Sequence, residues 1–302
     1  MYVQYSILRT MGEAALKTIF PLQIGVGTLA NVILFFQNVS PILTGLRMRP
    51  THTILAHMAV ANSLVLLFTG ILHAMVVFVL KKPLSNLGCK LVYYIRVVAR
   101  STTLCSTCVL SIYRFLTLVL GSPGTVMLRG RVPKAIGPVC STCWVFSALL
   151  NIYVPVMVTG PQDTNNDSNT QGNWFCSYSR RATGIVFLWS ASDAVCICLM
   201  GWASGSMMLL LQRHRQRVQH VHTTDHNHRC SPETRATHTV LMLLVIFVTF
   251  YMLSSMFTFY SIVFSYSHLW LMHASGVLSS CFPTVCPLLL IFRDPKKPRF
   301  CS

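Results

Sequence analysis

The sequence predicts an all-α protein, a bundle of seven transmembrane helices. Of the 302 residues, 53% are hydrophobic and only 10% are charged, whereas soluble domains carry roughly 25% charged residues. Apolar stretches long enough to cross a hydrocarbon core, which takes about 20 helical residues, recur seven times along the chain. The few charges gather between these stretches instead of recurring along them, so the apolar surface is expected to face lipid.

Each apolar stretch is expected to be a helix, because any other backbone conformation in lipid would leave polar groups without partners. The expected helices lie near 16–38, 52–80, 90–119, 135–158, 183–211, 237–264 and 268–292. Loops are short except at 159–182 and 212–236, so residues 1–302 are predicted to form one membrane domain without a soluble module. No internal repeat is visible, which argues against a transporter built from repeated bundles.

The orientation follows from the basic residues. With the C-terminus cytoplasmic, the inner loops and tail hold fourteen Lys and Arg residues and the outer segments hold seven. This excess predicts an extracellular N-terminus. The tripeptide Asn166-Asp167-Ser168 then falls in the outer loop as a glycosylation signal, whereas Asn38-Val39-Ser40 falls inside and is expected to stay unmodified.

Composition excludes several other functions. The formal net charge of +17 is spread over short basic runs beside the apolar stretches, without the interleaved aromatics of a nucleic-acid site. Membrane insertion explains these runs, so lipid is an expected partner and nucleic acid is not. No paired carboxylates, nucleophile motif or phosphate-binding glycine loop appears among the seven acidic residues. Neither an enzyme activity nor a cofactor is therefore expected.

Most of the twelve cysteines lie in apolar stretches, where a cysteine acts as a small hydrophobe. Cys105-x-x-Cys108 and Cys140-x-x-Cys143 have the spacing of a zinc or redox motif, but they lack polar surroundings, and we interpret them as packing residues. The range 222–228 carries three histidines without a closed ligand set, and we interpret it as a solvated basic loop. No metal site is predicted.

Two other cysteines are predicted to pair. Cys89 opens the third expected helix on its outer side, and Cys176 lies in the long outer loop. Both face an oxidising compartment, which favours a disulfide over two free thiols. Such a bond would hold the loop over the mouth of the bundle.

The inner end of the same helix carries Ile112-Tyr113-Arg114-Phe115, which resembles rhodopsin-like G-protein-coupled receptors. That family has an acidic-Arg-Tyr triplet at this distance from the disulfide cysteine, so the resemblance implies that Arg114 contacts the G protein. Tyr113 stands in place of the acid. Asn31 and Trp144 also match the family, whereas Asn62 stands in place of an aspartate that binds sodium.

Further segments resemble vomeronasal type-1 receptors across essentially the whole chain. They are Ser231-Pro232-Glu233-Thr234-Arg235-Ala236-Thr237, Phe282-Pro283-Thr284-Val285-Cys286-Pro287, His57-Met58-Ala59-Val60-Ala61-Asn62-Ser63 and Asn173-Trp174-Phe175-Cys176. The resemblance implies a plasma-membrane receptor that detects small pheromones or odorants and signals through a heterotrimeric G protein of the inhibitory type. Arg235 would contact that partner. A bitter-taste-type receptor is the nearest alternative, and a transporter is the alternative from another class.

Charges inside the bilayer indicate the ligand site, because each is costly unless it has a partner or faces a water-filled cavity. Arg96 and Arg100 are four residues apart on one helical face, two and three turns below the outer end. An anionic or strongly polar ligand would satisfy both guanidinium groups; alternatively, Asp193 neutralises one of them in a structural ion pair. Other candidate lining residues are Tyr93, Trp174, Phe257, Tyr260 and His273.

Overall fold

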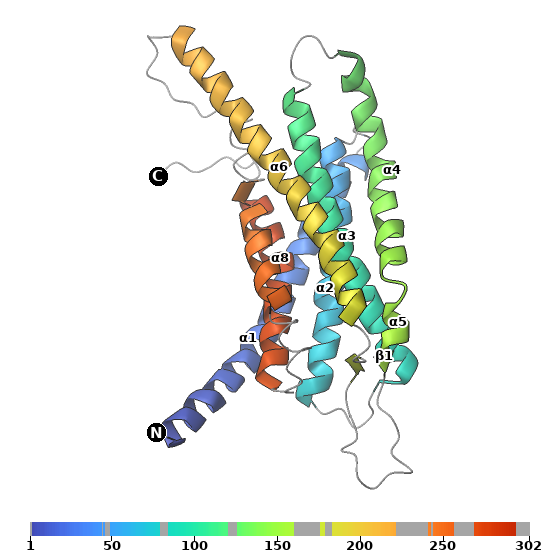
Figure 1. Cartoon of the computed structure of the whole chain (residues 1–302), viewed down its shortest axis with the longest axis vertical. Helices are drawn as coiled ribbons and strands as arrows, with labels where there is room; N and C mark the ends of the chain where they lie inside the picture. Colours follow the sequence, from blue (N-terminus) through green and yellow to red (C-terminus); the bar gives the residue numbers. More distant parts are fainter. Residues whose placement is uncertain are drawn as a thin grey trace.

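The structure, a computed structural model, describes residues 2–43, 45, 49–78, 84–119, 126–159, 176–178, 183–221, 241–242, 244–256 and 269–293. Its helices are α1 (Tyr2–Leu43), α2 (Pro50–Phe78), α3 (Asn86–Val119), α4 (Val126–Leu150), α5 (Val154–Met157), α6 (Thr183–Val221) and α8 (Leu269–Arg293). A shorter apolar helix, Leu244–Met256, is here called helix 244–256. The long helices run side by side along the molecule (Figure 1).

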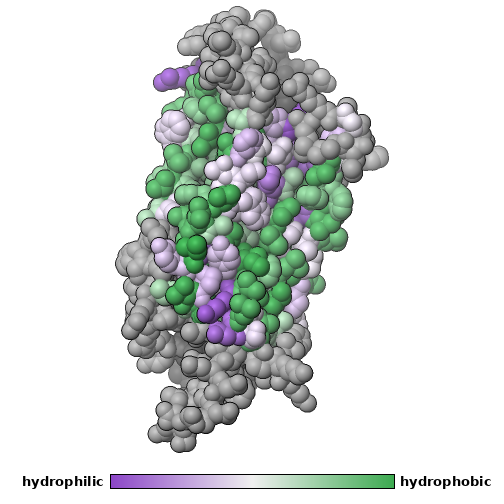
Figure 2. Space-filling view, turned by 90° about the vertical axis from the view of Figure 1, so that its right-hand side faces the viewer, coloured by the Kyte–Doolittle hydropathy of each residue, from purple (hydrophilic) through white to green (hydrophobic). Residues whose placement is uncertain are grey.

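Six of the described helices contain a stretch long and apolar enough to cross a membrane, and helix 244–256 is a seventh, shorter apolar helix. The prediction of a helical bundle is thereby confirmed for the described residues. Large apolar side chains remain exposed around the bundle, including Leu22 (70% exposed), Leu149 (61%) and Phe292 (75%). Such exposure would be unfavourable in water and is expected of a surface that faces lipid. Hydrophobic residues cover most of the middle band of the face in Figure 2.

Helix α3 lies at the centre of the bundle and packs against α2, α4, α5 and α6. Its sequence explains this position, because its buried face carries hydroxyl side chains that would be poorly placed against lipid. Thr107 donates to the carbonyl of Thr103 (2.7 Å), and Ser111 donates to the carbonyl of Thr107 (3.0 Å), so these hydroxyls have partners within the helix. Thr103 in turn donates to Asn62 of α2 at 3.0 Å.

Two prolines shape α8, and one of them explains how α1 attaches. Pro287 has no N–H to donate to the carbonyl of Pro283, four residues earlier. The side-chain amide of Asn31 in α1 donates to that carbonyl at 2.8 Å. The freed acceptor is therefore satisfied by a neighbouring helix, as a membrane interior requires. Gln23 makes a second link, donating to the carbonyl of Val277 at 3.2 Å.

The C-terminal end of α4 differs from that of the predicted helix 135–158. Helix α4 ends at Leu150, and a turn leads to the short helix α5 and then to strand β1 (Val158–Thr159). Pro155 provides the reason: it cannot donate to the carbonyl of Asn151, and it fits the first turn of a new helix. Strand β1 pairs antiparallel with strand β2 (Ser177–Tyr178), so the described residues include a small two-stranded sheet that an all-α prediction omits.

Candidate functional site

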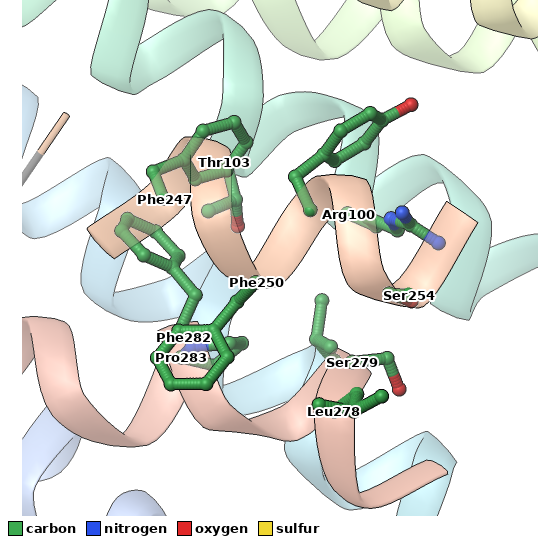
Figure 3. A pocket seen from close by; sticks show the side chains of 11 residues that line it. Arg100, Thr103, Phe247, Phe250, Ser254, Leu278, Ser279, Phe282 and Pro283 are labelled. Carbon is green, nitrogen blue, oxygen red and sulfur yellow. The ribbon is translucent and has the colours of Figure 1, made fainter. Parts of the chain in front are cut away.

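A small cavity of about 30 Å³ lies where α2, α3, helix 244–256 and α8 meet. It is lined by Val65, Arg100, Thr103, Phe247, Phe250, Tyr251, Ser254, Leu278, Ser279, Phe282 and Pro283. The cavity has two chemically different ends (Figure 3): Arg100, Ser254 and Ser279 lie at one end, and Phe247, Phe250 and Phe282 lie at the other. Its lining has the composition of small-molecule sites, which are mostly apolar with a few well-placed polar groups, and its volume has room for about two water molecules.

The aromatic end is held rigidly by packing. Phe247 meets Phe282 edge to face with ring centroids 4.6 Å apart, and it stacks on Tyr251 at 5.7 Å. Phe247 and Phe282 belong to a core cluster that also includes Met58, Leu104 and Cys286. Edge-to-face pairs add about 0.5–1.5 kcal/mol beyond burial. The cavity wall is therefore part of the bundle core.

Arg100 reaches Asp193 through an intervening tyrosine. The Arg100 guanidinium carbon lies 4.9 Å from the centroid of the Tyr251 ring, a cation–π contact. The Tyr251 hydroxyl donates to Oδ2 of Asp193 in α6. In the described part of the chain, Arg100 and Asp193 form no direct ion pair. The structure thus joins the two predicted charges into one network, and Tyr251 is the member that sequence analysis missed.

Arg96 has a different role from Arg100, although the two share a helical face. Its Nε donates to Thr69 of α2 at 3.0 Å, and its Nη2 donates to Ser279 of α8 at 3.2 Å. Arg96 does not line the cavity, but its partner Ser279 does. The side chain therefore ties three helices together beside the polar end of the cavity.

Of the other predicted ligand contacts, Tyr93 packs against Cys89, Val154 and Val158 near the N-terminal end of α3 and is not among the lining residues. Trp174, Phe257 and Tyr260 lie outside the described residues, and the side chain of His273 is likewise not described. The same holds for Arg235 and for the glycosylation signal at Asn166. The roles predicted for the residues that are not described therefore stay predictions.

The lining residues of helix 244–256 carry a signal that sequence analysis did not use. Phe247, Phe250, Tyr251 and Ser254 follow the spacing i, i+3, i+4 and i+7, which places them on one face of a helix. Three aromatic rings on one helical face are typical of packing as well as of binding. The sequence therefore cannot separate packing from binding. The cavity becomes visible only once residues of α3 and α8 are placed around that face.

Near the C-terminal end of α3, the Nε atom of Arg114 is buried and makes no hydrogen bond to the described residues. The next residue, Phe115, contacts Trp202 of α6 edge to face at 5.3 Å. A guanidinium group in this position keeps donors available for a further partner.

The predicted disulfide pair lies at the end of the bundle where α3 begins. Cys89 and Cys176 are bonded in the structure, with their Cα atoms 5.7 Å apart. Cys176 directly precedes strand β2, so the bond and the β1–β2 pair fix the same segment beside α3 and α5. Figure 1 places this part at the end of the bundle opposite the long extension of α6.

Membrane-length helices packed around a small interior cavity define a multi-pass helical membrane protein. Sequence comparison then identifies its family. A profile of the vomeronasal organ pheromone receptor family matches residues 14–302. The chain belongs to this family, and the predicted resemblance is confirmed.

The chain is also similar to individual receptors. It is 37% identical over 286 residues to vomeronasal type-1 receptor 1 of Gorilla gorilla gorilla, covering 93% of this chain and 81% of that protein. It is 35% identical over 280 residues to vomeronasal type-1 receptor 4 of Homo sapiens, covering 91% and 93%. A more distant relative is olfactory receptor class A-like protein 1 of Danio rerio, 28% identical over 284 residues, covering 92% and 88%. This protein is therefore a chemosensory receptor, a multi-pass protein of the plasma membrane.

Proposed function

We propose that the receptor binds a small pheromone or odorant in the cavity at Arg100 and signals through a heterotrimeric G protein of the inhibitory type. The N-terminus lies outside the cell and the C-terminus inside. One observation carries the proposal: a cavity with a cationic end and an aromatic end lies at the junction of four helices. A ligand that binds one arrangement of those helices better than another shifts their population, which is the requirement for signalling.

The charge balance supports an anionic or strongly polar ligand. Asp193 is the only acidic residue within the seven predicted spans, whereas Arg96 and Arg100 both lie in the outer part of α3. The spans thus hold two arginines near the cavity against one acidic residue, and a ligand carboxylate, sulfate or phosphate would balance this excess of positive charge. The aromatic end of the cavity suits an apolar body on the same ligand.

The ligand proposal is tested with matched pairs of compounds, each an acid and its neutral amide or ester, in cells that report inhibitory G-protein activation. Loss of a charge-assisted hydrogen bond costs about 1.5–3 kcal/mol, so Arg100→Gln should weaken the response to the acid by about 10- to 150-fold. The response to the neutral partner should change little. Lys90→Ala, on the same helix but outside the cavity lining, is the control. Equal effects on acid and amide would overturn the assigned charge recognition.

Coupling to the G protein is proposed to use Arg114. Arg114→Ala should abolish the response while leaving the amount of receptor at the cell surface unchanged. Phe115→Leu is the control, because it changes the neighbouring contact with Trp202 without removing a donor. Unchanged signalling by Arg114→Ala would remove this residue from the proposed mechanism.

The proposed orientation is tested by the two glycosylation tripeptides. Asn166→Gln should remove a glycosidase-sensitive shift in electrophoretic mobility, because Asn166 is expected to face outside. Asn38→Gln should not change mobility: Asn38 is buried, its amide donates to the carbonyl of Leu34 at 2.7 Å, and its Oδ1 lies 2.8 Å from Nδ1 of His52. A glycan on Asn38 would require the opposite orientation.

A further inference from the structure

Four cysteines from three helices form two sulfur pairs inside the bundle. Cys105 and Cys108 lie on α3, Cys143 on α4 and Cys196 on α6. The Sγ atoms of Cys105 and Cys143 lie 2.6 Å apart, and Cys108 belongs to a core cluster against which Cys196 packs. None of the four lines the cavity, so the proposed function makes no use of them.

A metal site does not explain these sulfurs. Among the described residues, no three His, Cys, Asp or Glu side chains are grouped so that they could hold a metal ion. A structural zinc site needs four ligands around one point. The arrangement is pairwise, and pairwise sulfur chemistry is disulfide formation.

The Cys105–Cys143 pair is close to the geometry of a bond. A disulfide joins its sulfurs at about 2.05 Å, so the pair needs to close by only roughly 0.5 Å. The two helices already pack against each other. They are also joined by a hydrogen bond from the Tyr94 hydroxyl to the carbonyl of Ala148 at 3.1 Å. The side chains therefore approach without a rearrangement of either helix.

We propose that Cys105 and Cys143 form a second disulfide, which cross-links α3 to α4 within the bundle. The two S–H bonds break, one S–S bond forms, and two protons and two electrons pass to the disulfide of an oxidoreductase in the secretory compartment, which becomes a dithiol. The same compartment provides the oxidising conditions for Cys89–Cys176. Because thiols in apolar surroundings are inert, the bond forms while the helices assemble and is then shielded from soluble reductants.

The cross-link is compatible with signalling. It joins α3 to α4, whereas the cavity is lined by α2, α3, helix 244–256 and α8. It therefore leaves helix 244–256 and α8 free to move relative to α3. Its effect is to fix the axis of the helix that carries Arg100 and Arg114.

Mass spectrometry of the full-length receptor tests the bond directly. Receptor purified without reductant is denatured in N-ethylmaleimide, digested and searched for disulfide-linked peptides. The expected result is one linked pair that contains Cys105 and Cys143 and one that contains Cys89 and Cys176, with maleimide on Cys140. Maleimide on both Cys105 and Cys143, in samples that retain the outer disulfide, would overturn the proposal.

Serine variants test its structural consequence without ligand or G protein. Cys105→Ser, Cys143→Ser and the double variant should shorten the half-time of thermal inactivation in detergent by the same factor, about several-fold, because each removes the same bond. Cys140→Ser is the matched control: Cys140 lies one turn away on α4 and packs against Ile54, Leu110 and Ile136. Losses that add in the double variant, or an equal loss in the control, would show that the two cysteines act only by packing.

Discussion

The hydrogen bond between Tyr251 and Asp193 is the interior contact whose contribution to stability can be tested most sharply. Tyr251→Phe keeps the ring beneath the Arg100 guanidinium, 4.9 Å from its centroid, but removes the hydroxyl that donates to Asp193. A carboxylate in the bundle would then lack its donor. The loss of a hydrogen bond to a charged group costs about 1.5–3 kcal/mol, and interhelical hydrogen bonds in membranes reach about 1.7 kcal/mol. We expect a loss of about 2 kcal/mol in the free energy of unfolding.

The measurement is thermal unfolding of the detergent-solubilised receptor, followed by tryptophan fluorescence. At about 2 °C per kcal/mol for a chain of this size, Tyr251→Phe should lower Tm by about 4 °C. Tyr153→Phe is the control, because Tyr153 is 52% exposed and lies in the turn after α4. Its Tm should equal that of the wild type.

A double-mutant cycle separates the contact from general damage. Asp193→Asn keeps an acceptor for the tyrosine hydroxyl but removes the charge, so the two single changes should interact by at least about 1 kcal/mol. Independent sites add within about 0.5 kcal/mol. Additive losses in the double variant, with Tm values that match the sum of the singles, would refute the assignment of Tyr251 as the link between Arg100 and Asp193.

Two further predictions follow from close approaches elsewhere in the bundle. A Cβ atom on Gly27 would lie 2.6 Å from Oγ1 and 3.2 Å from the backbone Cα of Thr284, so Gly27→Ala should lower stability by about 1–3 kcal/mol; Gly25→Ala, with nothing within 4 Å, should leave Tm unchanged or slightly raised. Cys89→Ser and Cys176→Ser should each reduce surface receptor to the same extent, and the double variant should be no worse, because all three lose one disulfide worth about 2–5 kcal/mol. Losses of surface receptor that add in the double variant would contradict a bond between Cys89 and Cys176.

The membrane-spanning helices were predictable because lipid imposes a simple length and composition rule on each of them. That rule says little about where a helix continues beyond the membrane, and α1 and α6 extend well past their predicted ends. The end of α4 did have a local signal in Pro155, which the apolar composition of the stretch 135–158 concealed. The lipid environment therefore explains why each stretch is a helix, whereas the residue at which each helix ends depends on single side chains.

The site was predictable in its charges but not in its partners. The spacing of Arg96 and Arg100 placed both on one face of α3, and burial made both candidates for ligand contact. Their roles diverge because Arg96 meets Thr69 and Ser279, whereas Arg100 meets the Tyr251 ring. Those partners come from other helices, and the rotation of one helix against another is set by packing of the whole bundle. The spacing of residues along one helix contains no information about this rotation.

The distribution of acidic groups connects the cavity to the proposed switching. Positions where rhodopsin-like receptors have acids carry Asn62 and Tyr113 here. Asn62 accepts a neutral hydrogen bond from Thr103, and Arg114 has a buried donor without a partner among the described residues. Neutral hydrogen bonds between membrane helices contribute only about 0.6 kcal/mol on average. The contacts of Arg96 and Arg100, by contrast, involve charged groups and lie beside the cavity. A ligand bound there, as proposed, would contact the network through Arg100 and Tyr251 that links α3, helix 244–256 and α6.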